Sequence, residues 1–257
     1  MSIASKDRPA SDDPNAVKTL AKALSLLDVV AAAEYPPTIS EVALRAGLAR
    51  PTAHRLVQTL VRASFLRQDP NDGRLTISYA VLPLAASLLD RNRLRLEALP
   101  QLQSLAQKMN ERVNLGILHH NRVLILAGVE KPALPTIYSR FGRTVPVHCT
   151  ALGKAMLAWL PAEEVETIVG AQPIVARTPK TITSAAKLAK ELQAIHARGY
   201  SIEDGENTPT SCCVGVPILD REDRPIGAIS VSGRTLEPLI KDIGEVQRAA
   251  EFISHVL

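Results

Sequence analysis

Aromatic side chains are scarce in this sequence, at 3% of 257 residues with a single tryptophan. Proteins that bind RNA or single-stranded DNA by base stacking need exposed aromatic rings, so the composition argues against that class. The three cysteines, Cys149, Cys212 and Cys213, form no C-x-x-C pair. They are too few for a disulfide framework, which argues against a small secreted scaffold.

Long apolar runs are also missing. No stretch approaches the roughly 20 apolar residues that span a bilayer. Residues 1–15 are polar, contain two prolines and lack the apolar segment of a signal peptide. We therefore expect a disordered leader on a cytoplasmic protein with no membrane partner.

The residues that are present describe a globular protein, with 46% hydrophobic and 22% charged residues. The length suits two domains, one small and one of ordinary size. A net charge of +4 and a pI near 9.0 are compatible with an acidic partner but do not establish one.

The segment 38–60 predicts a helix, a tight turn and a second helix. Thr38 or Ser40 is expected to cap the first helix, with Glu41 in its first turn. Gly47 suits the turn, either through a positive φ or through close backbone packing. Apolar residues at helical spacing predict the buried side of the second helix: Ala53, Leu56, Val57 and Leu60.

The other side of this second helix is rich in hydrogen-bond donors and contains no acid. The major groove of DNA is recognised by such groups, which pair with guanine edges, adenine edges and phosphates. An ordinary helical hairpin with a solvated polar face has a similar pattern, so the hairpin alone does not decide. The residues concerned are Arg50, Thr52, His54, Arg55, Gln58 and Thr59.

A β-hairpin is predicted directly after the second helix, over 63–78. Asp72-Gly73 is its expected turn, and Phe65, Leu66, Leu75 and Ile77 are its expected inward residues. A β-hairpin directly after the second helix of a helix-turn-helix is called a wing. From Glu41 to Ser78 there are six arginines and three acids, which favours a DNA-binding winged helix-turn-helix over the simple hairpin.

Helical patterns flank this segment. Residues 16–33 predict an amphipathic first helix, and 79–110 are largely helical, with Pro83 and Pro100 expected at starts or breaks. The run 90–95 is the expected hinge between domains. The leucine stripe of this region fits a dimer face or packing between the two domains equally well.

The second half predicts an α+β domain with an antiparallel sheet flanked by helices. A hairpin turn at His120-Asn121 separates two predicted strands, and Gly199 is the expected C-cap of a long helix. The predicted strands are 113–119, 122–130, 211–219 and 225–232. The predicted helices are 151–160, 161–169, 184–198 and 236–257.

Several motifs in order resemble those of one protein family. AKALSLLD (21–28) is similar to R-A-L-x-L-L-D, and GLARPTAHRL (47–56) is similar to G-L-P-x-S-T-A-H-R-L. RFGRTVPVHCTALGKAMLA (140–158) resembles R-x-G-x-x-x-P-x-H-x-T-A-x-G-K-A-x-L-A. GYSIEDGE (199–206), CVGVPI (213–218) and AISVSG (228–233) complete the set. Over residues 16–255 the chain resembles the IclR family of bacterial transcription regulators.

The resemblance implies an N-terminal winged helix-turn-helix and a C-terminal GAF-like effector domain. It also implies a homodimer or homotetramer that binds double-stranded operator DNA. Whether binding represses or activates transcription is left open. The implied effector is a small carboxylate, bound without a cofactor. Its implied ligands in this chain are His148, Thr150, Ala151, Glu203, Cys213, Ser230 and Ser232.

This chain departs from the family pattern at several of these positions. Glu203 replaces an aspartate, Gly205 replaces a glutamate, and residues 209–211 replace a common Gly-x-Arg, so the effector cannot be inherited. Pro51 stands where serine is usual, which changes the start of the recognition helix and with it the operator.

The residues themselves support an anion site. Thr150 opens a helix whose N–H groups favour an anion. Ser230 and Ser232 alternate along a strand and so share one face. Two strand hydroxyls with ordinary partners would look the same, and Cys213 alone fits a buried core position. The expected apolar wall of the site is Leu115, Ile117, Val145 and Val214.

Three other functions fit the sequence less well. An enzyme would use His148, Cys149 and Cys213, or His119, but no G-x-S-x-G or H-E-x-x-H motif occurs. His119 and His120 are adjacent on a strand and make a poor metal pair, and a zinc site at His148 or Cys149 is also disfavoured. A DNA-architectural protein would not need the large second domain.

The sequence therefore predicts a regulator with no catalytic or metal-binding residues. Its expected parts are a leader (1–15), a winged helix-turn-helix (16–78), a linker helix (79–95) and an effector domain (96–257). The predicted DNA contacts are Thr38, Arg50, Pro51, Thr52, His54, Arg55, Gln58, Thr59, Arg67 and Arg74.

Overall fold

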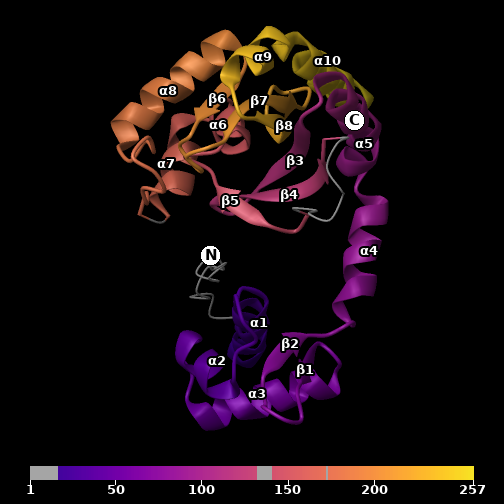
Figure 1. The fold of residues 1–257 in the computed structure, drawn as a ribbon. Helices are drawn as coiled ribbons and strands as arrows, with labels where there is room; N and C mark the ends of the chain where they lie inside the picture. Colours follow the sequence, from indigo (N-terminus) through magenta and orange to yellow (C-terminus); the bar gives the residue numbers. More distant parts are fainter. Residues whose placement is uncertain (1–16, 132–140, 172) are drawn as a thin grey trace. The chain divides into compact units, whose positions relative to one another are not determined.

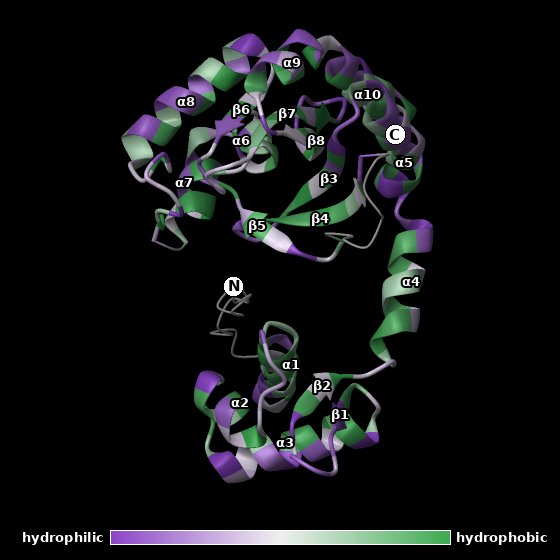
Figure 2. Cartoon of the chain, viewed as in Figure 1, coloured by the Kyte–Doolittle hydropathy of each residue, from purple (hydrophilic) through white to green (hydrophobic). Residues whose placement is uncertain are grey.

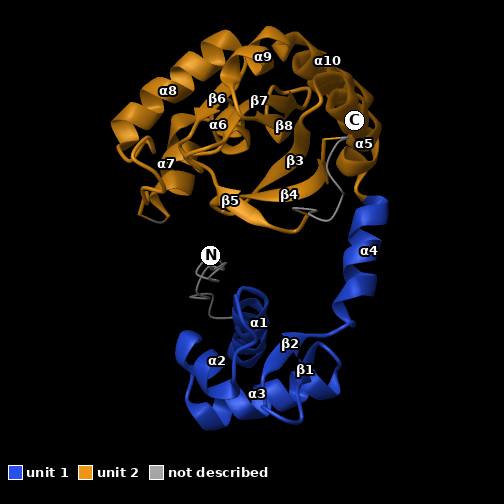
Figure 3. Cartoon of the chain, in the orientation of Figure 1, with its two compact units in different colours: residues 1–91 blue, residues 92–257 orange. Residues whose placement is uncertain are grey.

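The computed structural model describes residues 17–131, 141–171 and 173–257. The chain divides into two compact units, 1–91 and 92–257 (Figure 3). The division lies inside the predicted linker of 79–95. The predicted leader of 1–15 lies outside the described residues. Among the described helices, none is long and apolar enough to cross a membrane.

The first unit contains the predicted helix-turn-helix and wing. Thr38 caps the second helix in a capping box with Glu41: the Glu41 N–H donates to the Thr38 hydroxyl, and the Thr38 N–H donates to the Glu41 carboxylate at 2.7 Å. Gly47 has φ +65° with open space where a Cβ would be, so the turn needs its conformation and not its small size. The elements are α1 (Lys18–Ala31), α2 (Ile39–Arg45), α3 (Arg50–Arg62), β1 (Leu66–Gln68), β2 (Leu75–Ile77) and α4 (Val81–Arg91).

One apolar cluster holds α1, α2, α3 and the wing together. Val57 of α3 is fully buried, as are Leu26 of α1, Val42 of α2 and Leu75 of β2. The helical stripe that was predicted for the second helix is confirmed, since Ala53 and Leu60 are also buried and Leu56 packs at the edge.

Helix α4 is apolar but buries no residue (Figure 2). Leu82, Leu84 and Leu88 are each about 60% exposed. By contrast, Leu102 and Leu105 of the next helix are buried in the core of the second unit. The predicted leucine stripe thus splits into a part that packs within the second unit and a part that no described residue of the first unit buries.

The second unit is built on a six-stranded sheet with the order β5-β4-β3-β8-β7-β6, in which every pair is antiparallel. The predicted α+β class is therefore confirmed. The strands are β3 (Arg112–His119), β4 (Arg122–Val129), β5 (Thr144–Pro146), β6 (Ser201–Asp204), β7 (Cys212–Leu219) and β8 (Pro225–Gly233). The helices are α5 (Arg93–Met109), α6 (Ala151–Leu157), α7 (Ala162–Gly170), α8 (Ala185–Arg198), α9 (Leu236–Lys241) and α10 (Ile243–Val256).

Two predictions about helices were wrong. Pro100 lies inside α5, on an exposed side of the helix. A proline cannot donate a hydrogen bond to the Leu96 carbonyl, but at this exposed position water can do so. The predicted closing helix of 236–257 is two helices, α9 and α10, which meet at Asp242.

The two faces of the sheet carry different helices (Figure 1). Helices α5, α9 and α10 cover one face and pack on Val113, Val214 and Val231. Helices α6, α7 and α8 lie on the other side, in a second cluster that includes Ile125 and Ala228. Because side chains alternate along a strand, the residues directly before and after each of these valines point toward α6.

Candidate functional site

The exposed side of α3 holds most of the predicted DNA contacts. Arg50, Thr52, His54 and Arg55 are exposed, and none of their side chains has a partner among the described residues. Arg67 on the wing is exposed in the same way. Pro51 is the second residue of the helix and offers no donor, so it can make only apolar contacts.

Four other predicted DNA contacts are engaged inside the first unit. The Thr38 hydroxyl donates to Glu41 within the capping box, at 2.9 Å. The Thr59 hydroxyl donates to the Arg55 carbonyl at 2.9 Å. Arg74 donates to the Pro36 carbonyl at 2.6 Å. These groups also shape the domain, and their role as donors to DNA stays a prediction.

Gln58 is the fourth of these predicted DNA contacts, and its side-chain hydrogen bond links α3 to the wing. Its amide donates to Gln68 at 3.2 Å, and Gln68 donates to the Gly73 carbonyl at 3.1 Å. This chain of amides fixes the wing against α3. Arg67 is thereby held on a hairpin that is tied to the same helix as Arg50 and Arg55.

In the second unit, the register of the sheet brings most of the predicted effector ligands together. Glu203, Cys213 and Ser232 lie opposite one another on β6, β7 and β8, and Arg112 follows on β3. Directly opposite residues of antiparallel strands point to the same face. A second row, two residues along the strands, consists of Ser201, Gly215, Ser230, Asn114 and Gly128.

Helix α6 begins directly over this polar face. The Ser201 hydroxyl donates to the Ala151 carbonyl at 2.6 Å. A Cβ on Gly215 would lie 2.6 Å from the same carbonyl oxygen, so this glycine lets the helix approach the sheet. Thr150 caps the helix by accepting from the Gly153 N–H, which leaves the amides of Ala151 and Leu152 without an acceptor among the described residues.

Glu203 is more constrained than the sequence suggests. Its carboxylate accepts the Asn207 N–H at 2.9 Å, and burial raises its pKa. Thr178 and Thr181 anchor the same loop through the carbonyls of Gly205 and Glu206, each at 2.7 Å. Gly205, where the family pattern has glutamate, has φ +72°, a conformation that glycine adopts without strain.

Ser230 and Ser232 differ in their surroundings. Ser232 accepts a hydrogen bond from the Cys213 thiol at 3.2 Å and keeps its own proton free to donate. Ser230 is 4% exposed, and its hydroxyl has no partner among the described residues. Ser230 thus lacks the protein partner that Ser232 has, and its role as a ligand stays a prediction.

Two further polar side chains at this face were missed by sequence reasoning. Asn114 is 5% exposed, and its Oδ1 is buried without a hydrogen-bond partner in the described ranges. Glu206 is also buried, and its Oε2 has no hydrogen-bond partner among the described residues. The signal for Asn114 was present in the sequence in part, because it is a polar residue between the apolar Val113 and Leu115 of a predicted strand. That it shares a face with Ser230 follows only from the register of β3 and β8.

Glu206 is half of a buried ion pair. Its other oxygen accepts from the Lys154 ammonium, and Lys154 is 1% exposed in α6. Glu191 lies 3.7 Å from the same nitrogen and is itself bonded to Arg198 at 3.0 Å. This network joins α6 to α8 behind the polar face.

The predicted apolar wall was largely wrong. Leu115, Ile117 and Val214 belong to the core on the α5 side of the sheet, opposite to the serines. Only Val145 packs in the cluster on the α6 side. The error is one of strand parity, since neighbouring residues of a strand face opposite sides.

The groups that a catalytic or zinc site would use are poorly suited to it. Burial raises the pKa of the Cys149 thiol to about 12, and burial with Glu203 nearby raises that of Cys213 to about 12. A neutral thiol is a weak nucleophile and a weak metal ligand. His148 lies with its Nε2 3.2 Å from the Val175 carbonyl, not within the rows described above. Within the described residues, no group of three or more His, Cys, Asp or Glu side chains could hold a metal.

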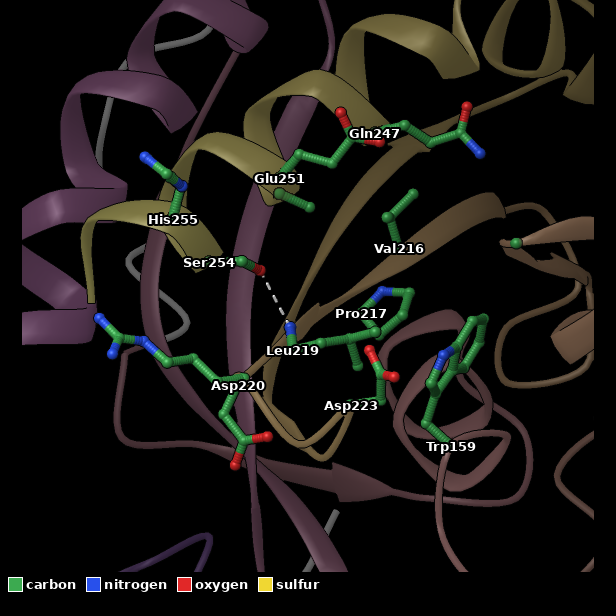
Figure 4. Close-up of a pocket in the computed structure, with 13 residues that line it drawn as sticks. Trp159, Val216, Pro217, Leu219, Asp220, Asp223, Gln247, Glu251, Ser254 and His255 are labelled. Atoms are coloured by element: carbon green, nitrogen blue, oxygen red, sulfur yellow. Dashed lines mark hydrogen bonds between the residues drawn. The ribbon is translucent and has the colours of Figure 1, made fainter.

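A separate surface cavity of about 660 Å³ lies beside α10 and the β7–β8 turn (Figure 4). Its polar groups are partly engaged already. The Leu219 N–H donates to the Ser254 hydroxyl at 3.1 Å, and Asp220 accepts from two amides of its own turn. None of the predicted effector ligands lines it.

Comparison with known proteins matches both units. Residues 19–70 match the IclR helix-turn-helix domain, and residues 86–255 match the bacterial transcriptional regulator IclR C-terminal domain. The chain is 32% identical to the glycerol operon regulatory protein of Streptomyces coelicolor, over 84% of this chain and 85% of that protein.

Solved structures agree. An IclR family transcriptional regulator from Brucella abortus has a TM-score of 0.84 at 27% identity, covering 96% of this chain and 94% of that one. An IclR homologue from Microbacterium hydrocarbonoxydans, complexed with 4-hydroxybenzoate, has a TM-score of 0.77 at 26% identity, covering 92% and 98%. The chain belongs to the IclR family of transcription regulators, which are DNA-binding proteins and not enzymes.

Proposed function

We propose that the second unit binds a small organic acid at the polar face under α6, and that the bound acid controls the affinity of the first unit for operator DNA. The observation that carries the proposal is Ser230, which is 4% exposed and whose hydroxyl has no protein partner among the described residues. Buried polar groups in native proteins are almost always hydrogen-bonded, so an unpartnered cluster points to a ligand.

The donors at this face suit a carboxylate. Ser230 and Ser232 offer two hydroxyls, and the amides of Ala151 and Leu152 offer two N–H groups where α6 meets the sheet. The 4-hydroxybenzoate complex of the Microbacterium relative is a precedent for a small carboxylate in this fold. Glu203, which can only accept when ionised, would repel the acid group and belongs at the other end of the ligand.

Removing both hydroxyls should weaken the ligand without disturbing DNA binding. A thermal-shift screen of small carboxylates, with 4-hydroxybenzoate among them, supplies the probe. Calorimetric titration should then show Ser230→Ala with Ser232→Ala binding it about 1–3 kcal/mol more weakly than the parent. Ser104→Ala, an exposed serine of α5, is the matched control and should leave the affinity unchanged.

Equal affinity for parent and double variant would remove the serines from the site. If no carboxylate bound the intact protein at all, the ligand-free, DNA-architectural alternative would be favoured.

We further propose that the working unit is a homodimer or homotetramer. The exposed leucines of α4 offer an apolar face, and paired half-sites on DNA demand two-fold symmetry. Analytical ultracentrifugation at micromolar concentration should therefore detect a species of at least twice 27.7 kDa. A single 27.7 kDa species would contradict the proposal.

A further inference from the structure

Asn114 presents a buried hydrogen-bond acceptor that none of the described residues uses. The residue is 5% exposed, and its Oδ1 has no hydrogen-bond partner in the described part of the chain. It lies between Ser230 on β8 and Gly128 on β4, directly opposite each, on the face that points toward α6. A buried acceptor without a hydrogen bond costs free energy, so a ligand that places a hydrogen-bond donor on it gains affinity.

Gly128 keeps the carboxamide in this position. A Cβ built on Gly128 would lie 3.1 Å from Asn114 Oδ1, which is tighter than an ordinary contact. The next nearest atom to that Cβ is 3.9 Å away, and the glycine does not have a positive φ. An alanine here would therefore displace the carboxamide and disturb little else.

We propose that Asn114, with Gly128 beneath its carboxamide, forms a subsite for a ligand hydroxyl, so that the effector is a small hydroxylated carboxylate. This inference rests on the proposed function. A carboxylate cannot donate to Oδ1, whereas a hydroxyl can donate to it and also accept from the side-chain amide. Neighbouring strands are about 4.8 Å apart, so a small molecule with its acid group at Ser230 can place a hydroxyl over Asn114.

The test uses pairs of carboxylates that differ by one hydroxyl: glycolate and acetate, lactate and propionate, 4-hydroxybenzoate and benzoate. Calorimetric titration of the whole protein should show at least one pair in which the hydroxylated acid binds about tenfold more tightly. Asn114→Leu and Gly128→Ala should each reduce this ratio toward one, while the affinity for the acid without the hydroxyl stays unchanged. Gly170→Ala, whose Cβ would meet nothing within 4 Å, is the control and should keep the ratio.

A second readout separates ligand recognition from a structural role. Leucine at 114 removes an unsatisfied buried acceptor, so the ligand-free variant should melt at the same temperature as the parent or about 2–4 °C higher. A clearly lower melting temperature would indicate that Asn114 is needed for the fold and would overturn the assignment.

The other outcomes are equally decisive. If carboxylates bind the parent but hydroxylated and plain acids bind equally, the hydroxyl subsite is wrong and the proposed function stands. If the ratio persists in both variants, another residue reads the hydroxyl. If none of the six acids binds, the proposed function fails and this inference fails with it.

Discussion

Alanine at both Arg50 and Arg55 is expected to remove most of the operator affinity of the protein. Both guanidinium groups are exposed on α3 and have no partner among the described residues, so they are available to DNA. If both contact phosphates, the slope of log affinity against log salt should flatten by about 2. Each one that contacts a guanine edge should instead cost about 1–3 kcal/mol and relax specificity at one base pair.

Fluorescence anisotropy with the operator fragment at several salt concentrations measures both quantities. The charge-matched control is Arg221→Ala with Lys190→Ala, two exposed cations of the second unit. That control should bind like the parent. If the Arg50 and Arg55 double variant also matched the parent at every salt concentration, α3 would not be the recognition helix.

Glu206→Gln is expected to destabilise the second unit strongly. The substitution keeps the shape of the side chain but replaces the carboxylate with a neutral amide. Among the described residues, the Lys154 ammonium, which is 1% exposed, then has only the carboxylate of Glu191, at 3.7 Å. Breaking a buried pair on one side typically costs about 3–5 kcal/mol, because the remaining charge is uncompensated. Urea denaturation of the full chain should show this loss in the transition of the second unit.

A related prediction concerns the variant in which both Lys154 and Glu206 are replaced. Lys154→Met alone should also be costly, but Lys154→Met with Glu206→Gln removes both charges and should recover much of the loss. Strictly additive effects of the two substitutions would show that the pair is not coupled. Lys180→Met, which breaks an exposed pair with Asp204, should leave the transition where it is.

Local signals in the sequence were sufficient where one or two residues decide a structure. The capping box of Thr38 and Glu41, the positive φ of Gly47, and α8 bounded by Ser184 and Gly199 all follow from short-range chemistry. The turn at His120-Asn121 is confirmed for the same reason: His120 has φ +54° between β3 and β4.

The errors came from features that need long-range pairing. The short strands β5 and β6 have too few residues to show an alternating pattern, so they were missed. Leu115 and Val214 were placed on the wrong face because parity relative to the serines is set by the register of three strands, β3, β7 and β8. Glu203 looked like a free ligand group until the loop that it binds was in place.

The central claim is that an acid bound in the second unit changes the affinity of the first unit for DNA. The most direct test is an operator titration of the full chain, with and without a saturating carboxylate identified by calorimetry. The operator dissociation constant of the parent should change by about fivefold or more, whereas that of the Ser230→Ala, Ser232→Ala variant should not change at the same ligand concentration. An unchanged operator dissociation constant in a parent protein that calorimetry shows to be fully ligand-bound would contradict the account.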